Sequence, residues 1–425
     1  MPDQPDGGPA LAAAPPWRRL LLAISLVLMA FVLRVPVASV GPVLPEAARA
    51  IALSAAASSV LTTLPSLCFG IFSPLAAVLR RRIGIERGIL AALLAIAAGT
   101  ALRGIAEAPF LFGGQILACL GIAIVNVLLP GLVKQDFPGQ AALMTGLYVT
   151  ALCGGAAVAA AFTVPLRLAF GGSWAGALAV WAIPAVIAAA LWAPNLPARV
   201  SASRAHRIVV RGLWRDALAW QLTLFMGLQS AFAYIGFGWL APMLRDRGLS
   251  ARQAGFVLAA NVLAQAVSSL VAPTLATRRR DQRAINLVAV VVCTLGFEAC
   301  IFGPLSLAWL ASTAFGLAQG ALFAVGLTMI VLRAADAPVA AELSAMAQTI
   351  GYSVASLGPL AAGLLRGATG NWNAVGALGL AMGVALAAAG LGAGRAIQVR
   401  AVSAALPYAA RSGSPASDSA KAASS

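Results

Sequence analysis

Arg34 is the residue whose type and position point most directly to chemistry. It lies inside the apolar run 20–44, about 21 Å along a helix from Leu20. A bilayer core is about 30 Å thick, and a charge held within it costs at least about 2.5–3.5 kcal/mol. A guanidinium presents a planar fork of N–H donors, which suits a small anion. The alternative is a structural arginine that extends outward to the interface or pairs with an acid.

Neutral polar side chains lie in other apolar runs and are the expected companions of Arg34. The predicted solute-binding set consists of Arg34, Asn126, Tyr148, Gln229, Ser230, Tyr234, Gln319, Gln348 and Tyr352. Amides and phenols can orient a small polar solute. Alternatively, each one simply bonds a neighbouring helix. Three of the four tyrosines of the chain belong to this set and lie far from the interfaces that tyrosine prefers.

Glu298 is the clearest carboxylate within an apolar run, in the middle of residues 285–303. A proton-coupling acid would have this placement, so Glu298 is the candidate for proton coupling. A structural pairing, or a shallow position near the outer end of a helix, is the alternative.

Two arginine triplets and one nearby arginine form a candidate cytoplasmic gate through ion pairs with acids such as Glu86 or Asp281. The gate set consists of Arg80, Arg81, Arg82, Arg87, Arg278, Arg279 and Arg280. A purely topological role for these charges is the alternative.

Other chemistries find no support in the sequence. His206 is the single histidine and lies in a polar loop, so a histidine metal site is excluded. The five cysteines all lie in apolar runs without C-x-x-C spacing, which argues against disulfides and metal binding. There is no P-loop, so ATP does not act directly, and no cofactor is expected. A membrane-embedded enzyme would need a nucleophile–base pair or a metal cluster in the spans, and we expect no enzyme.

The elements that position these residues follow from composition. Of 425 residues, 61% are hydrophobic and only 10% are charged, with a mean hydropathy of +0.91. A soluble domain carries about 25% charged residues, so a polytopic membrane protein remains. Leu-, Ala- and Val-rich runs of about 20 residues predict an all-α protein with twelve transmembrane helices. The expected spans are 20–44, 55–79, 88–106, 109–133, 141–165, 173–193, 218–243, 253–276, 285–303, 306–332, 341–365 and 373–394.

The net charge of +16 comes from 29 basic and 13 acidic residues. Most of the basic residues fall on one side when the N-terminus is placed inside, so the charge indicates topology and no nucleic-acid partner is expected. Both termini and the central loop are then cytoplasmic. The expected organisation is a disordered N-terminus 1–16, a six-helix bundle 17–193, a cytoplasmic linker 194–216, a second six-helix bundle 217–394 and a disordered tail 395–425.

The two halves repeat at an offset of about 200 residues. Leu-Ser-Ala occurs at 53–55 and 249–251, the arginine triplets follow, and Asp-x-Pro occurs at 136–138 and 336–338. Tyr148 and Tyr352 lie at matching places in the two halves. Such an ordered set of matches indicates two related six-helix repeats, the architecture of the major facilitator superfamily.

Several strings make the chain resemble the cyanate/2-nitroimidazole transporter (CynX/NimT) family of that superfamily. They include Leu33-Arg34, Ser39-Val40-Gly41-Pro42, Leu61-Thr62-Thr63-Leu64-Pro65, Asn126-Val127-Leu128-Leu129-Pro130, Gly227-Leu228-Gln229-Ser230 and Gly358-Pro359. One departure is Val35, which stands where the family usually has proline directly after the arginine.

The resemblance implies a carrier of small anions such as cyanate, or of small nitro-heterocycles. It also implies that the spans holding Arg34, Asn126, Gln229 and Gln319 line a central cavity. The leading hypothesis is a secondary transporter of a small polar or anionic solute that works by alternating access, acting as a monomer in a bacterial-type inner membrane. The alternative is an exporter of neutral or aromatic molecules. A membrane receptor without transport is a third hypothesis, which the repeat architecture does not support.

Overall fold

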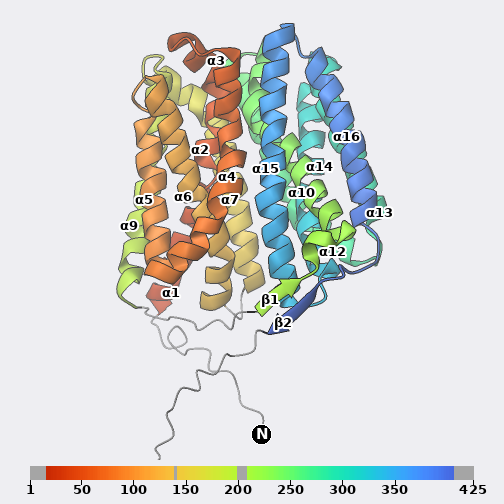
Figure 1. Cartoon of the computed structure of the whole chain (residues 1–425). Coiled ribbons are helices and arrows are strands. Elements are labelled where there is room, and N and C mark those ends of the chain that lie inside the picture. The colour runs from red at the N-terminus through yellow and green to blue at the C-terminus, as the bar shows by residue number, and fades with distance from the viewer. Residues whose placement is uncertain (1–15, 138–140, 199–207, 406–425) are drawn as a thin grey trace, which may run out of the picture.

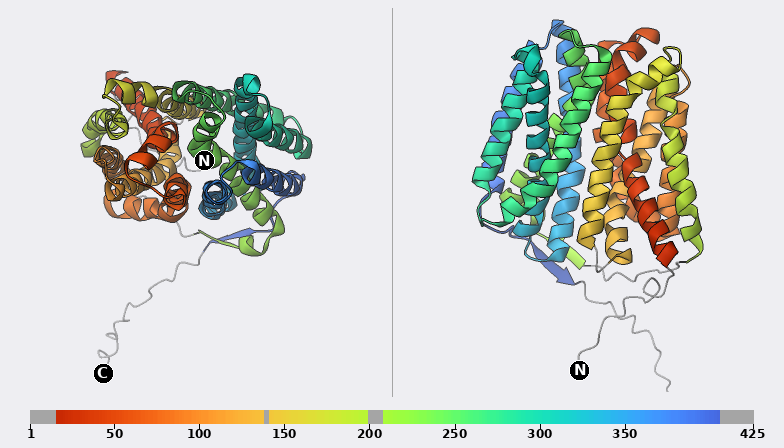
Figure 2. Two further views of the ribbon diagram at one scale, coloured as in Figure 1. Left: turned by 90° about the horizontal axis from the view of Figure 1, so that it is seen from above. Right: turned by 180° about the vertical axis from the view of Figure 1, so that it is seen from behind.

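The computed structural model describes residues 16–137, 141–198 and 208–405 and is almost entirely helical. Its helices stand in two groups, one before residue 199 and the other after residue 207 (Figures 1 and 2). Helix α3 (Val40–Ala50) lies at one end of the bundle, here called the α3 end. Strands β1 (Ile208–Arg211) and β2 (Val402–Ala405) lie at the opposite end, here called the strand end.

The N-terminal half contains the first group of helices. They are α1 (Pro16–Val32), α2 (Val35–Ala38), α3, α4 (Ala55–Ile83), α5 (Ile85–Leu102), α6 (Ala108–Asp136), α7 (Ala141–Ala169), α8 (Trp174–Ala179), α9 (Ala182–Trp192) and the 3-10 turn η2 (Ala193–Ala198).

The C-terminal half contains the second group. Its elements are η3 (Leu213–Arg215), α10 (Ala217–Ile235), the π-helical turn η4 (Gly236–Leu240), α11 (Ala241–Asp246), α12 (Ala251–Thr277), α13 (Arg283–Phe302), η5 (Leu305–Leu307), α14 (Ala308–Arg333), α15 (Ala337–Thr369) and α16 (Asn373–Ala393).

Eleven segments of the described chain are long and apolar enough to cross a membrane. The remaining expected span, 341–365, lies within α15, a helix of 33 residues that runs the height of the bundle (Figure 1). The all-helical membrane fold with two six-helix halves is therefore confirmed.

The repeated Leu-Ser-Ala strings mark the same structural position in the two halves. Ser54 is the N-cap of α4 and accepts a hydrogen bond from the backbone N–H of Ala57, 3.1 Å away. Ser250 is the N-cap of α12 and forms a capping box with Gln253. The sequence repeat thus encodes matching helix starts.

Three expected spans are interrupted, and a proline without an N–H donor explains each interruption. The span 20–44 breaks at Leu33 and Arg34, because Pro36 cannot continue the ladder of α1. The span 173–193 breaks after α8, before Pro184. The span 218–243 widens into η4, just before Pro242. Each of the three is still long and apolar enough to cross a membrane, so the interruptions refine the expected spans without removing any of them.

The two halves meet along two helix pairs, α4 with α15 and α7 with α12. Small residues allow this close approach. A Cβ atom at Gly255 of α12 would lie 2.7 Å from the carbonyl oxygen of Ala160 in α7, so a larger residue would push the halves apart. Both pairs run beside the space between the halves, and the site lies between them.

The central linker and the tail depart from expectation. Residues 208–211, inside the expected linker, pair antiparallel with residues 402–405, inside the tail expected to be disordered. The Asp216 carboxylate also accepts a hydrogen bond from the backbone N–H of Arg400, at 2.9 Å. These hydrogen bonds pair the backbone N–H and C=O groups of both segments. A polar composition does not show that two segments distant in the sequence will pair in this way. The expected N-terminal segment lies outside the described residues, except for Pro16.

Candidate functional site

A cavity of about 320 Å³ lies between the two halves. All nine residues of the predicted solute-binding set line it, namely Arg34, Asn126, Tyr148, Gln229, Ser230, Tyr234, Gln319, Gln348 and Tyr352. They come from both halves of the chain, so neither half could form the cavity alone. Their contact with a solute remains a prediction.

Arg34 reaches the cavity from the break between α1 and α2. The last carbonyls of α1 end here, and a cation is favoured at the C-terminus of a helix. Within the described chain Arg34 forms no ion pair, and its buried Nε makes no hydrogen bond. The guanidinium carbon instead lies 5.6 Å from the centre of the Phe237 ring, within the range of a cation–π contact.

The cavity wall carries one charged side chain among the described residues, and that is Arg34. No described aspartate, glutamate or histidine lines it. A half-buried cation without an acid beside it leaves a positive site inside the protein, where attraction to an anion is stronger than in bulk water. The wall therefore favours a negatively charged or electron-rich solute.

Four aromatic side chains form one side of the cavity. Phe69 lies edge-on to Tyr234 and Tyr352, with ring centres 6.1 and 5.8 Å apart, and the two tyrosines are 6.3 Å from each other. Phe237 completes the group, 6.2 Å from Tyr234. The buried hydroxyl of Tyr234 makes no well-formed hydrogen bond in the described chain and interacts with the nearby Arg34 side chain, so a solute held by Arg34 could also accept a hydrogen bond from it.

The amides of the wall are partly engaged with the protein. Gln229 donates to the carbonyl of Met226 and to Ser230, and Gln348 donates to Ser344. The buried Oε1 of Gln319 has no partner, although its Nε2 contacts a sulfur atom. The N–H donors of Gln229 and Gln348 are engaged with the protein, which supports the structural interpretation. The Oε1 of Gln319 has no partner in the described chain, which supports the solute-binding interpretation.

Sequence reasoning missed several lining residues. Phe69, Phe237, Cys153 and Ser344 also line the cavity. Nothing distinguishes an aromatic or small residue at a wall from one in a core when only the sequence is known. Phe237 had one signal: the Gly-Phe-Gly-Trp sequence before Pro242 favours an irregular helix, and π-turns are frequent at functional sites.

The cavity extends from Arg34 toward the strand end. Tyr148 and Ser344 line it near the starts of α7 and α15, and Leu129 and Leu327 near the ends of α6 and α14. These four helix ends lie on the strand side of the bundle (Figure 1).

At the α3 end the halves are joined. Arg245 of α11 donates two hydrogen bonds to the Glu46 carboxylate of α3, at 2.9 and 2.8 Å, and one to the carbonyl of Pro42 at 3.2 Å. Arg167 of α7 lies 3.7 Å from the same carboxylate. Next to this bridge, a Cβ at Gly41 would lie 2.4 Å from the carbonyl oxygen of Phe237. The halves are therefore in close contact here.

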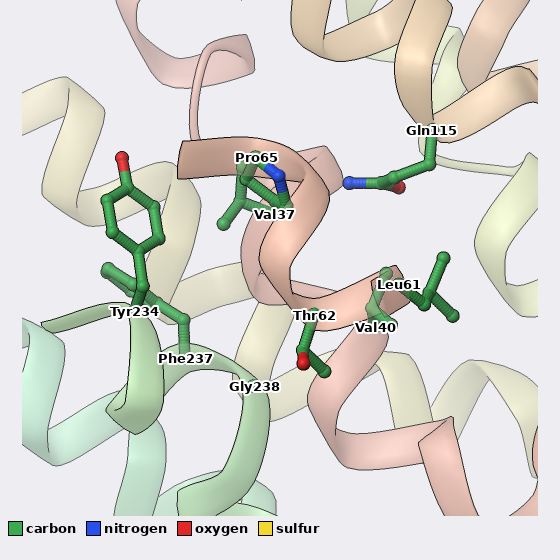
Figure 3. Close-up of a pocket in the computed structure, with 9 residues that line it drawn as sticks. All are labelled: Val37, Val40, Leu61, Thr62, Pro65, Gln115, Tyr234, Phe237 and Gly238. Carbon is green, nitrogen blue, oxygen red and sulfur yellow. The ribbon is translucent and has the colours of Figure 1, made fainter. Parts of the chain in front are cut away.

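A second, smaller hollow lies where α2, α3 and α4 face η4 (Figure 3). Tyr234 and Phe237 line both this hollow and the large cavity, so they separate the two. Figure 3 shows the amide of Gln115 pointing toward the α2 segment at Val37. Arg34 is thus approached from the strand side, with aromatic side chains between the cavity and the α3 end.

Glu298 and the predicted gate lie away from the cavity wall. The Glu298 carboxylate has no hydrogen-bond partner in the described chain and faces α16, where Cβ atoms at Gly379 and Gly376 would lie 2.6 and 2.9 Å from its oxygens. The side chains of Arg82, Arg87, Arg278, Arg279 and Arg280 are exposed and form no ion pair with described residues. Asp281 pairs with Arg283 instead. The side chains of Arg80 and Arg81 lie outside the description.

Two six-helix halves around a shared polar cavity are the arrangement of a membrane transporter. Residues 22–359 match the family model described as Major Facilitator Superfamily. The chain belongs to this superfamily and, within it, to the cyanate/2-nitroimidazole transporter family.

Two relatives from Escherichia coli K12 carry this assignment. The chain is 40% identical to the 2-nitroimidazole transporter, over 90% of this chain and 97% of that protein. It is 30% identical to the cyanate transport protein CynX, over 83% of this chain and 91% of that protein. An uncharacterized Bacillus subtilis transporter, YycB, is 35% identical over 88% of this chain and 93% of that protein.

Solved structures agree on the fold. The nucleoside transporter NupG superimposes with a TM-score of 0.72 at 13% identity, covering 88% of this chain and all of the other. A D-xylose–proton symporter gives a TM-score of 0.69 at 14% identity, over 89% of this chain and 98% of the other. At such identities the likeness concerns the fold alone.

Proposed function

We propose that this protein is a secondary active transporter of a small polar anion, that it works by alternating access, and that Arg34 holds the solute. The observation that carries the proposal is the unpaired Arg34 in a wall without described acids. A planar guanidinium binds a carboxylate-like or linear anion through two donors, which a lysine cannot reproduce. A cavity of about 320 Å³ is at the small end of ligand pockets, which suits a small solute.

The relatives support a small solute without fixing it. Proteins named for 2-nitroimidazole and for cyanate transport share the whole fold with this chain. Both names describe compact molecules with electron-rich nitrogen or oxygen atoms. Arg34 and the hydroxyl of Tyr234 could bind such atoms, while Phe69 and Tyr352 cover the solute from the side.

The strand end faces the cytoplasm in this proposal, because it carries the arginine triplets. The structure then corresponds to the state that admits solute from the cytoplasm, with Glu46 and Arg245 holding the other end together. Alternating access would break this bridge and close the strand end by rocking one half against the other. The predicted arginine gate would act in that second state.

The coupling ion is a separate question. A monoanion that leaves a negative-inside cell is favoured by about 2.3 kcal/mol per 100 mV, so accumulation of an anion inside the cell requires coupling to another ion. The cavity wall offers no described acid for this purpose. Proton coupling through Glu298 stays a prediction. Because Glu298 does not line the cavity, a proton on it could not act on a bound solute by direct contact.

Export of neutral aromatic molecules is the second candidate function. The group of Phe69, Tyr234, Tyr352 and Phe237 favours it, because aromatic rings prefer offset or edge-on contact with other rings. The two functions differ in their need for the positive charge. An anion carrier depends on Arg34, whereas a carrier of neutral rings depends on the aromatic group.

Counterflow in proteoliposomes tests the proposal, with cyanate, nitrate and 2-nitroimidazole as probes. We expect Arg34→Ala to abolish anion counterflow and Arg34→Lys to retain only a small part. Arg366→Ala is the matched control, because Arg366 contacts Asp246 and Trp372 at the α3 end and is outside the cavity. Normal anion counterflow by Arg34→Ala would refute the proposal. Transport of 2-nitroimidazole alone, insensitive to Arg34, would favour the second function.

A further inference from the structure

Arg103 is fully buried, although it directly follows the last residue of α5, where a charged residue would be expected to reach solvent. A buried cation normally has an acidic partner. Arg103 has none among the described residues and is held by oxygen atoms of neutral groups instead. This environment requires an explanation, because burial of an uncompensated charge is costly.

Two of the three acceptors of Arg103 lie beside helix interruptions of the N-terminal half, and the third lies within α6. Its Nη1 donates to the carbonyl of Pro36 and to Oε1 of Gln115, each at 3.0 Å. Its Nη2 donates to the carbonyl of Leu178, at 3.4 Å, in the last turn of α8. Gln115 of α6 also donates to the Pro36 carbonyl, at 3.4 Å. One guanidinium therefore joins α5 and α6 to both breaks.

Pro36 lies two residues after Arg34, in the short helix α2 that follows the break. The break interrupts the regular helical bonds between α1 and this segment, which keeps its own bonds from Ala38 to Arg34 and from Ser39 to Val35. The bonds from Arg103 and Gln115 hold the segment from outside the large cavity, because neither residue lines it. The direction in which Arg34 leaves the backbone thus depends on a contact that the solute does not touch.

Glycines let the helices approach closely enough for this contact. A Cβ at Gly99 of α5 would lie 2.5 Å from the backbone nitrogen of Ala118 in α6. A Cβ at Gly114, next to Gln115, would lie 3.1 Å from Cγ of Arg103. The packing of α5 on α6 is therefore arranged around the Arg103 side chain.

We propose that Arg103 is a positioning residue for solute binding: it clamps the Pro36 carbonyl at the break of the first span and so holds Arg34 toward the cavity. The inference rests on the proposed function, in which Arg34 binds the solute. It adds a residue that acts without touching the solute. Removal of the clamp should leave the cavity chemistry unchanged but place Arg34 less accurately.

Arg103→Lys is the test variant, because it keeps the buried charge but replaces the planar guanidinium fork, whose two terminal nitrogens reach the three acceptors, with a single compact ammonium. Gln115→Leu is the second variant, which removes the Gln115 donor to Pro36 together with one acceptor of Arg103. Arg333→Lys is the matched control. Arg333 is also buried and also donates to backbone carbonyls, those of Ala393 and Gly394, but it lies at the strand end of the other half.

Hydrogen–deuterium exchange tests the clamp independently of transport. We expect faster exchange in peptides covering residues 30–45 for Arg103→Lys and Gln115→Leu, and no change there for Arg333→Lys. Unchanged exchange in this segment for both test variants would overturn the inference.

Binding of cyanate, measured by thermal-shift titration, tests the positioning. We expect Arg103→Lys to raise the Kd for cyanate about tenfold. In metal sites, removal of a residue that orients a ligand without touching the metal weakens metal binding about 10- to 100-fold, and we take the low end of that range. In an Arg34→Lys background the same change should have little further effect. Equal effects of Arg103→Lys in both backgrounds would overturn the inference alone. An unchanged Kd for Arg34→Lys and Arg34→Ala would instead overturn the proposed function together with it.

Discussion

Removal of Arg245 should shift the protein toward a state that is open at the α3 end. The Glu46–Arg245 bridge joins the two halves, with side chains that are 12% and 17% exposed. Its two bonds of 2.9 and 2.8 Å form the bidentate geometry that arginine and carboxylate prefer. Arg245→Met removes these bonds and leaves the rest of α11 in place.

The size of the effect follows from this geometry. A hydrogen bond to a charged group contributes about 1.5–3 kcal/mol. Arg167 stays 3.7 Å from Glu46, so the carboxylate is not left alone and the loss stays near the lower end. A shift of about 2 kcal/mol corresponds to about a 30-fold change in the ratio of the two states.

Labelling of Cys153 measures this ratio. Cys153 lines the cavity, whereas the other four cysteines are buried outside it. We expect a membrane-impermeant maleimide, applied from the α3 side, to label Arg245→Met up to about 30 times faster than the unmodified protein. Cys153→Ser identifies the background signal.

Arg366→Met provides the matched control, because it breaks the Arg366–Asp246 bridge of 3.0 Å at the same end but within one half. It should label at the unmodified rate. If Arg245→Met reacts no faster than Arg366→Met, the cross-half bridge does not hold the α3 end closed and the reasoning fails.

Three further outcomes are expected. Burial alone would raise the pKa of the Glu46 carboxyl, but the hydrogen bonds and the charge of Arg245 hold this pKa below its ordinary 4.5. The bridge therefore stabilises the closed α3 end fully above pH 4.5, and this stabilisation is lost as the pH falls through the lowered pKa of Glu46. The ratio of Cys153 labelling between Glu46→Gln and the unmodified protein should thus stay constant from about pH 5 to 8 and approach unity in stronger acid; a decline already near neutrality would contradict this. If Glu298 couples protons, Glu298→Gln should retain solute counterflow but lose the response of net uptake to an imposed pH gradient; a retained response would refute proton coupling through Glu298. Gly41→Ala should speed labelling from the α3 side, since its Cβ would lie 2.4 Å from a carbonyl oxygen of η4, whereas Gly154→Ala, with nothing within 4 Å, should not.

The fold and much of the cavity wall could be predicted from the sequence because membranes limit the choices. Apolar runs must become helices, and polar side chains inside them must face protein or water. That rule alone placed Arg34, Tyr148 and Tyr352 in one set, which the structure brings to one cavity. The two-half fold followed from the repeated helix starts at Ser54 and Ser250.

The breaks and the clamp could not be predicted, because they depend on contacts between distant residues. Pro36 signals an interruption but does not show that Arg103, 67 positions later, bonds its carbonyl. Arg103 lies near the end of the expected span 88–106, where nothing in the sequence indicates burial, because burial depends on how α5 packs on α6. The pairing of Glu46 with Arg245 likewise joins residues 199 positions apart.

The short sheet at the strand end has a practical consequence for measuring motion. Strands β1 and β2 tie the chain before α10 to the chain after α16, and the backbone N–H of Val399 donates to the carbonyl of Arg333 in α14, at 2.9 Å. The last described residues are thus fastened to the C-terminal half. A fluorophore on β2 paired with one on η2 would therefore form a molecular ruler, whose changing length records the rotation of one half against the other during each turnover.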